Sequence, residues 1–550
     1  MKRIYLALSL LLLSTPAFAQ HADHAVDAKP AVLMDGYGDW HHAVSTRNPE
    51  AQRFFDQGLR LVYAFNHEEA VRSFQRAAEL DPDCAMAYWG VALALGPNIN
   101  ADVDPEREKL AYESIQKAVG LAAKVSEPER AYIEVMAKRY SNDPKADLKK
   151  LNVDYKNACA ELVKRYPDDL DAATFYAESI MLLRPWQYWS ADGKPAEGTL
   201  ELVAVLEAVL KRNPDHVGAN HYYIHAVEAS LHPEWALPSA QRLKVLTPAA
   251  GHLVHMPAHI DIRTGNYEAA ARANVYAAQA DRDYFKTAGT ESIYAMMYYS
   301  HNLHFLTMAN CMQGRFTDSQ RAAGQLETHV KQYLNGPMAE MMLPMLDSML
   351  PTPTLVLIRF RKWGEILASP EPDKKLLVTG AMWHFARGLA YAANGKIADA
   401  ENEQKLFAAA TKTVPPNAPY GLNTTASVFK VAEPVLAGKI MLAKGDKKAA
   451  IEFLKRAVEA EDALRYDEPA DWQLPVRESL GGALLLSGEY GEAEQVFRAD
   501  LEKNPRSGRS LFGLVESLKA QGKQAAAAFV QNELAAAWKN AEVKLRVQDL

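Results

Sequence analysis

Small, apolar and turn-forming positions recur in a fixed order along this chain of 550 residues. From Phe55 the sequence reads FDQGLRLVYAFNHEEAVRSFQRAAELDP, in which Gly58, Ala70, Phe74, Ala77 and Pro82 mark two packed helices and the end of the second. A turn glycine followed by an apolar helix pattern returns at 265–280, 395–410, 445–460 and 488–505. More divergent units are visible at 84–125, 127–169, 170–215, 216–249, 300–333, 337–370 and 508–541. The pattern predicts helix pairs over nearly everything after residue 50.

This register resembles the tetratricopeptide repeat, a helix-turn-helix unit of about 34 residues whose small residues let two helices pack closely. The resemblance implies an all-α fold, a right-handed superhelical solenoid of about eleven or twelve helix pairs with a concave groove lined by the first helices. We expect an N-terminal array with a histidine-lined groove at 51–333 and a C-terminal array continuous with it at 334–550. Many unrelated scaffolds use this repeat, so it indicates fold rather than function.

Two insertions depart from the plain repeat, GPNINADVDP (96–105) and RPWQYWSADGKP (184–195). Both follow a first helix, so we expect both to emerge on one rim of the solenoid. The stretches FNHEEA, AMAYWGVALALGPNIN and HMPAHI also resemble those of a group of secreted bacterial tetratricopeptide proteins. That resemblance spans most of the chain and implies no activity.

The first nineteen residues have the features of a cleaved signal peptide. Lys2 and Arg3 precede an apolar run from Ile4 to Leu13, and Ala17-Phe18-Ala19 has the small-x-small pattern that a signal peptidase accepts. We expect cleavage after Ala19, a flexible leader at 20–50, and a periplasmic or secreted bacterial protein. The apolar run is too short to span a bilayer, and no later segment has eighteen uninterrupted apolar residues, so no membrane span is predicted.

Charge and cysteine content exclude two classes of protein. The chain has 61 basic and 68 acidic residues, a net charge of −7, and the basic residues are dispersed, which disfavours a nucleic-acid interface. Its three cysteines, Cys84, Cys159 and Cys311, are too few for a disulfide framework. No phosphate loop, zinc-protease helix or nucleophile elbow is present.

Histidines occupy equivalent positions in three neighbouring units. His221 and His225 follow Pro214 by seven and eleven residues, and His255 and His259 follow Pro248 by the same intervals. Likewise His252 and His255 precede Gly265 by thirteen and ten residues, as His301 and His304 precede Gly314. At about 100° per residue, the histidines of one helix lie on one face. Seven imidazoles aligned in this way predict a polar pocket on the groove.

The residue types in this pocket indicate a transition metal. Neutral imidazole is a common ligand for zinc, copper, nickel and iron, and His-x3-His offers two ligands from one helix face. The candidate metal residues are His221, His225, Glu228, His252, His255, His259, His301 and His304. Glu228 is a candidate ligand, a residue that orients a ligand, or a base acting on metal-bound water.

The identity of the metal depends on the helix that contains HNLHFLTMANCM. Thioether and thiolate groups from Met308 and Cys311 would favour copper over zinc. The alternative is that these residues fill the core of a helix pair, where methionine is ordinary packing. Pro257 also leaves two possibilities, a kink between His255 and His259, or a helix that begins late and leaves His252 and His255 on a loop.

A second function fits the same groove. Many proteins with this repeat bind a partner protein or peptide, and the histidines would then donate hydrogen bonds to an extended chain together with Arg263, Asn220 and Asn302. His384 is a further candidate groove residue. The sequence therefore predicts a pocket for a metal or small ligand, with a metal-free scaffold for a periplasmic protein or peptide as the alternative. It indicates ligands better than catalysis.

Overall fold

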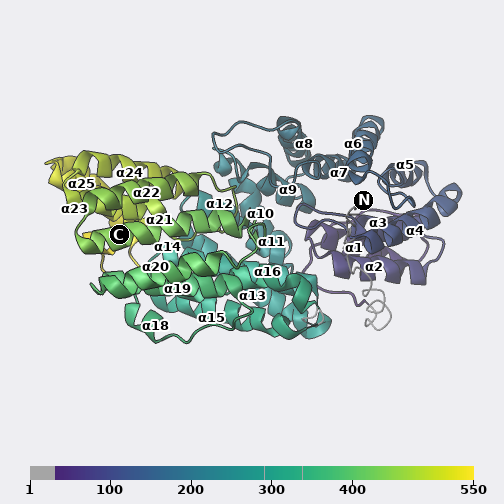
Figure 1. Ribbon diagram of the computed structural model, residues 1–550. Helices are drawn as coiled ribbons and strands as arrows, with labels where there is room; N and C mark the ends of the chain where they lie inside the picture. Colours follow the sequence, from purple (N-terminus) through teal and green to yellow (C-terminus); the bar gives the residue numbers. More distant parts are fainter. Residues whose placement is uncertain (1–30, 290–291, 337) are drawn as a thin grey trace, which may run out of the picture.

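The computed structural model describes residues 31–289, 292–336 and 338–550 and shows an all-α solenoid (Figure 1). The expected signal peptide and the first part of the expected leader lie outside these residues. Within them, helices pair with their neighbours along the chain. The first six pairs are α1 (Pro49–Tyr63) with α2 (His67–Leu80), α3 (Ala85–Leu95) with α4 (Pro105–Leu121), α5 (Glu127–Met136) with α6 (Leu148–Arg165), α7 (Leu170–Met181) with α8 (Thr199–Arg212), α9 (Val217–Val227) with α10 (Leu237–Leu246), and the broken helix α11 (Gly251–His255) and α12 (Pro257–Arg263) with α13 (Tyr267–Ala288).

The remaining pairs continue in the same way. They are α14 (Ser300–Met312) with α15 (Phe316–Gln332), α17 (Thr352–Arg359), which follows α16 (Ala339–Met349), with α18 (Trp363–Ala368), α19 (Leu377–Ala393) with α20 (Ile397–Thr411), α21 (Thr425–Lys444) with α22 (Lys447–Asp462), α23 (Val476–Ser487) with α24 (Tyr490–Lys503), and α25 (Gly508–Ala520) with α26 (Gln524–Ala537). Short helices η2 (Ala122–Lys124), η3 (Pro233–Ala236), η4 (Ala295–Tyr299), η5 (Tyr333–Asn335) and η6 (Val547–Asp549) and one hairpin, β1 (Pro419–Tyr420) with β2 (Asn423–Thr424), complete the described elements. The predicted all-α fold and number of helix pairs are confirmed.

Glycines at repeat positions let one phenylalanine hold three helices together. The Phe74 ring of α2 packs so closely on Gly58 of α1 and Gly90 of α3 that an added Cβ would lie 2.7 and 2.4 Å from it. Gly481 and Gly513 face Phe497 of α24 in the same way. Contacts this short exclude any side chain at these glycines, which explains why the small and aromatic positions recur together in the sequence.

The helix containing Pro257 is broken rather than delayed. Helix α11 ends at His255 and α12 begins at Pro257, with Met256 between them in the helical region of backbone space. Both His252 and His255 are therefore helical, and the alternative that placed them on a loop is wrong. Proline lacks the amide that would continue the hydrogen-bond ladder, so the kink lies between His255 and His259, as expected for this residue.

The C-terminal array packs back against the middle of the chain. Gly265, after α12, lies against the Pro505 carbonyl, and the Glu542 amide donates to the Gly314 carbonyl at 2.9 Å. At the centre of this contact Arg359 and Arg509 both donate to the buried carboxylate of Glu478, Arg509 through Nε at 2.7 Å. The solenoid therefore closes on itself at this point.

The β-hairpin positions the loop that follows α22. The Asn423 side chain accepts from the Arg465 amide at 2.9 Å and donates to the Arg465 carbonyl at 3.0 Å and to Asp471 at 2.7 Å. The Leu422 amide donates to Asp467 at 2.8 Å. These contacts hold Glu468, which lies between the two aspartates, in a fixed position.

Residues 31–48 differ from the flexible leader that we expected. His42 Nδ1 and Trp40 Nε1 contact the two oxygens of Asp171 on α7, at 2.7 and 3.1 Å. Ser45 donates its amide to Glu129 at 2.6 Å, and the Tyr37 ring is buried. This part of the leader is packed on the N-terminal array because buried carboxylates there accept its polar groups.

One stretch, Ala339–Arg359, is long and apolar enough to cross a membrane by length and composition. It is divided into α16 and α17, which contact α15 and α19, and it ends in the buried ion pair of Arg359 with Glu478. Its surroundings are those of a packing helix within the solenoid.

Loss of the His42 ion pair should release the leader at high pH. Burial alone would lower the pKa of His42, but its hydrogen bond and ion pair with Asp171 raise it above the ordinary 6.5. The stabilisation from this ion pair is therefore complete below about pH 6.5 and is lost as the pH rises through the folded-state pKa. Each unit by which the folded-state pKa exceeds 6.5 changes the equilibrium for release of the leader by up to tenfold. Hydrogen exchange of residues 31–48 should accelerate as the pH rises above about 6.5, relative to His42→Gln at the same pH. Identical pH dependence in the two proteins would contradict this account.

Removal of the Glu478 carboxylate should destabilise the closure of the solenoid. In Glu478→Ala two buried guanidinium groups lose their partner, which costs about 3–5 kcal/mol in the free energy of unfolding. Denaturant unfolding followed by hydrogen exchange in α23 and α25 measures this loss. Glu161→Ala, which removes an exposed ion pair with Lys164, is the control and should change the free energy of unfolding by about 1 kcal/mol or less. An equal effect of the two substitutions would be inconsistent with the buried ion pairs.

Candidate functional site

Six imidazoles converge in the interior where α9, α11, α12 and α14 meet. They form two groups of three, each with one donor atom per residue within 4.8 Å of the others. We call them the first triad, His221, His225 and His252, and the second triad, His255, His259 and His301. All except the half-buried His301 are at most 2% exposed. The histidines aligned in sequence do cluster, but in a closed interior rather than on an open groove.

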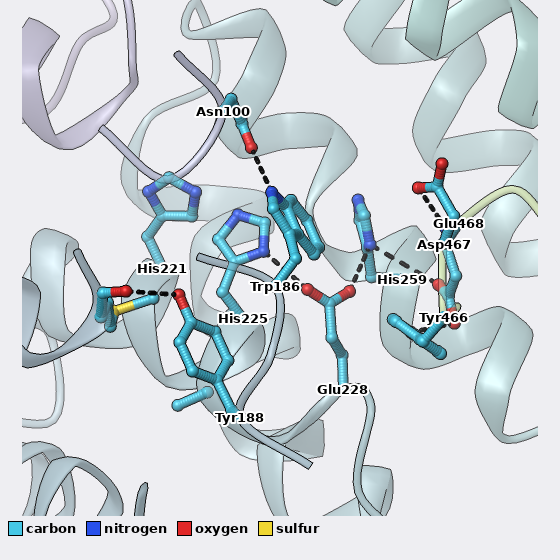
Figure 2. Close-up of polar contacts among 12 residues, drawn as sticks. Asn100, Trp186, Tyr188, His221, His225, Glu228, His259, Tyr466, Asp467 and Glu468 are labelled. Carbon is cyan, nitrogen blue, oxygen red and sulfur yellow. Dashed lines mark hydrogen bonds and ion pairs between the residues drawn. The ribbon is translucent and has the colours of Figure 1, made fainter. Parts of the chain in front are cut away.

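Glu228 lies between the two triads and contacts a ring of each. Its Oε1 lies 2.7 Å from Nδ1 of His225, and its Oε2 lies 2.5 Å from Nδ1 of His259 (Figure 2). A carboxylate accepts hydrogen bonds, so both rings donate through Nδ1. Both oxygens of Glu228 are thereby engaged with the outer nitrogens of the rings, an arrangement typical of a residue that orients metal ligands.

Two further rings are oriented by neutral acceptors. His221 Nδ1 lies 2.7 Å from the Tyr63 carbonyl, and His255 Nδ1 lies 2.7 Å from Asn274 Oδ1. The orientation of the Asn274 amide is fixed because its Nδ2 donates to the Ala270 carbonyl at 2.9 Å. Both imidazoles must therefore carry their hydrogen on Nδ1 when neutral, which leaves Nε2 as an acceptor.

The remaining nitrogens face one another with too few hydrogens between them. His255 Nε2 lies 2.8 Å from His259 Nε2 and 3.1 Å from His301 Nε2, and His252 Nε2 lies 3.0 Å from His221 Nε2. In their neutral forms, His255 and His259 present two lone pairs to each other. His225 Nε2 and His252 Nδ1 are buried without a hydrogen-bond partner. A cation among these nitrogens, either a proton or a metal ion, would satisfy them.

Burial disfavours protonation of most of the cluster. It lowers the pKa of His221, His252, His255 and His301 well below the ordinary value, and the neighbouring imidazoles lower it further. Burial would raise the pKa of Glu228, but His259 and His225 bring it down to about 2. The site therefore combines an ionised carboxylate with imidazoles that keep their lone pairs at neutral pH, the form in which they bind metals.

The C-terminal array contributes one side of the site. Glu468 Oε2 lies 3.5 Å from His259 Nδ1 and is buried without a hydrogen bond, while its other oxygen accepts from the Tyr466 hydroxyl (Figure 2). Burial and the nearby Glu228 raise the pKa of Glu468 well above its ordinary range. Glu228, His259 and Glu468 form a further group with donor atoms within 4.8 Å, which uses the outer side of His259. Arg263 donates to the carbonyls of Glu228 and Ser230, both at 3.0 Å, and so closes the end of α9.

The two insertions cover the first triad. Trp186 packs edge-on against His225 with ring centroids 5.2 Å apart, and its Nε1 donates to Asn100 Oδ1 at 3.1 Å (Figure 2). Asn100 in turn donates to the Tyr298 hydroxyl at 3.2 Å, and the Tyr298 ring lies 4.8 Å from that of His252. Asn100 is exposed and Trp186 is half-buried, so the layer between solvent and the first triad is thin here.

The other candidate residues lie outside the triads. The His304 ring contacts Gln473, and burial lowers its pKa to about 4. Met308 and Cys311 are buried in two separate apolar clusters, the packing role that the sequence left open. Asn220 donates to the Pro214 and His216 carbonyls at the start of α9, and Asn302 donates to Asp281. His384 contacts Glu403 in the C-terminal array.

Three contributors were missed in the sequence. Asn274 replaces an apolar residue among the alanines of a second helix, and this polar interruption was the available signal. Glu468 lies in the stretch RYDEPADW, whose three acidic residues gave no indication of the histidines. The Tyr63 carbonyl gave no signal, because any residue supplies a backbone acceptor.

No protein-family model matches this sequence, and no curated protein matches it. Several solved structures match over most of the chain. They include a human IFIT1 dimer with m7Gppp-AAAA (13% identity, 90% of this chain and 91% of that chain, TM-score 0.32), yeast Tom70 (12%, 88% and 90%, 0.28) and the Cut9–Hcn1 hetero-tetramer of the APC/C (12%, 89% and 78%, 0.30). The helix pairs themselves show that this chain is an all-α solenoid, the architecture that the resemblance to tetratricopeptide repeats implied.

Proposed function

We propose that this protein is an exported tetratricopeptide-type solenoid that binds a transition metal through the imidazole cluster in its interior. The observation that supports this is the orientation of the rings. His221, His225, His255 and His259 each direct Nδ1 to an outer oxygen acceptor. Their Nε2 lone pairs are thereby turned towards a common interior, as in metal sites whose histidines are held by outer acceptors.

A proton is the alternative occupant. If His259 were the imidazolium form, its Nε2 hydrogen would bridge to His255 and its charge would pair with Glu228. One such proton leaves His225 Nε2 and His252 Nδ1 without partners. A metal ion satisfies several nitrogens at once, and we favour it for this reason.

The donor set favours zinc or copper without selecting between them. Both ions bind neutral imidazole well. The argument for copper from thioether and thiolate ligands does not apply, because Met308 and Cys311 lie in apolar clusters away from the triads. Glu228 fits the role of orienting the rings better than that of a base, since both of its oxygens accept from imidazoles.

The protein-binding alternative uses another part of the molecule. The helical-repeat fold suits a scaffold for proteins or peptides, as the sequence suggested. An extended peptide cannot reach the histidines, which are buried beneath the insertions and the C-terminal loop. A partner protein would therefore bind elsewhere on the solenoid, and such binding is compatible with an interior metal site.

The proposal of export depends on the first nineteen residues alone. Their basic start, apolar run and Ala17-Phe18-Ala19 site support delivery to the bacterial periplasm or the medium. Sequencing the mature N-terminus of the protein from a periplasmic fraction tests this, and a mature chain that still begins at Met1 would contradict it.

Metal content tests the main proposal. Protein expressed with its own signal peptide and purified without an affinity tag should contain near-stoichiometric zinc or copper by mass spectrometry of the elements. His255→Ala combined with His259→Ala should lower the affinity for that metal by about tenfold or more. His232→Ala removes an exposed histidine that pairs with Glu234 and should leave the metal unchanged. Protein that contains no metal and cannot be reconstituted with zinc or copper would contradict the proposal.

A further inference from the structure

We propose that the cluster is a two-metal site, with one ion in each triad and Glu228 as the positioning residue that the two ions share. This inference rests on the proposed function and specifies how many ions bind and where. The alignment of the histidines in the sequence predicted a single pocket. In the structure the donors fall into two separate sets of three, and this separation is the basis for proposing two ions.

Each triad is sufficient for one ion. The first triad takes two ligands from α9, four residues apart on one helix face, and a third from α11. The second takes one ligand each from α11, α12 and α14. Three protein nitrogens with a fourth position open are the ligand set of many zinc sites that bind a further small ligand. Neither triad needs a donor from the other.

A single ion does not account for the six rings. Among the described residues, the groups whose donor atoms lie within 4.8 Å of one another never combine members of both triads. The contacts between neighbouring Nε2 atoms, at 2.8, 3.0 and 3.1 Å, also lie within a triad. The triads nevertheless lie side by side, with the rings of His225 and His259 centred 5.6 Å apart and those of His252 and His255 5.9 Å apart. Two ions would therefore be neighbours.

Glu228 links the triads through its two oxygens. It orients one ring of the first triad and one ring of the second, and its charge is shared between them. Helix α11 is the other link, because it contributes His252 to the first triad and His255 to the second. A shared carboxylate between two cations stabilises both, since it offsets positive charge in a buried site.

The open positions suggest the kind of ligand that the pair would take. With three nitrogens on each ion, both ions have a vacant position, and a small anion or dioxygen-sized molecule can bridge neighbouring ions. Trp186 and Asn100 cover the first triad, so a ligand bound beneath them must be small. The chemical class of ligand is therefore a small bridging group such as hydroxide or azide.

Zinc stoichiometry tests this inference on the full chain. Metal-free protein titrated with Zn²⁺ by calorimetry should bind two ions. His221→Asn with His252→Asn should bind one ion, as should His255→Asn with His301→Asn, and thermal unfolding reports whether each variant is folded. Glu228→Ala should weaken both ions by about 10-fold or more, because it removes the two oxygens that each orient a ring, one in each triad. His232→Asn is the matched control and should bind two.

A measurement on the unaltered protein covers the case in which a variant does not fold. With Cu²⁺ as the probe, the electron paramagnetic resonance signal per copper should fall when the second equivalent is added, because neighbouring copper ions couple magnetically. Azide should perturb the spectrum of the pair. One ion per chain with an uncoupled signal, lost in both triad variants, would overturn the two-metal inference while leaving the proposed function intact. No bound zinc or copper at all would overturn both.

Discussion

The Glu228 carboxylate fixes which nitrogen carries the hydrogen on two of the six clustered imidazoles, and the chemistry of the site depends on that constraint. Because its two oxygens accept from His225 and His259, those rings direct their lone pairs inward. The Tyr63 carbonyl and Asn274 do the same for His221 and His255. Outer acceptors around a buried core of unprotonated nitrogens make a site that is incomplete without a cation.

The solenoid supplies this arrangement by stacking similar helix pairs. Histidines at equivalent positions of successive first helices lie side by side because each pair repeats the packing of the one before it. Closure of the solenoid then covers the face on which these histidines lie. The C-terminal array packs back through Glu478 and brings Glu468 to His259, while the insertions bring Trp186 to His225. A face that would line an open groove becomes an enclosed site.

The sequence predicted the parts of this structure that depend on local pattern. Glycine, alanine and phenylalanine at fixed intervals predicted the helix pairs, since close packing on Phe74 and Phe497 requires glycine opposite. The common register predicted that the histidines would meet. The sequence could not predict the division into triads, because that division depends on which nitrogen each ring exposes. A backbone carbonyl such as that of Tyr63, which orients one of these rings, cannot be recognised from the sequence. Glu468 was missed for a related reason, since its contact depends on closure between distant units.

X-ray absorption spectroscopy of the zinc-loaded protein tests the central claim most directly, because it reports the ligand atoms themselves. The account predicts a shell of nitrogen neighbours at about 2.0–2.1 Å with the outer scattering of imidazole rings, and this imidazole signal should be lost only when both triads are removed. A sulfur shell at about 2.3 Å, or a light-atom shell without imidazole scattering, would contradict it.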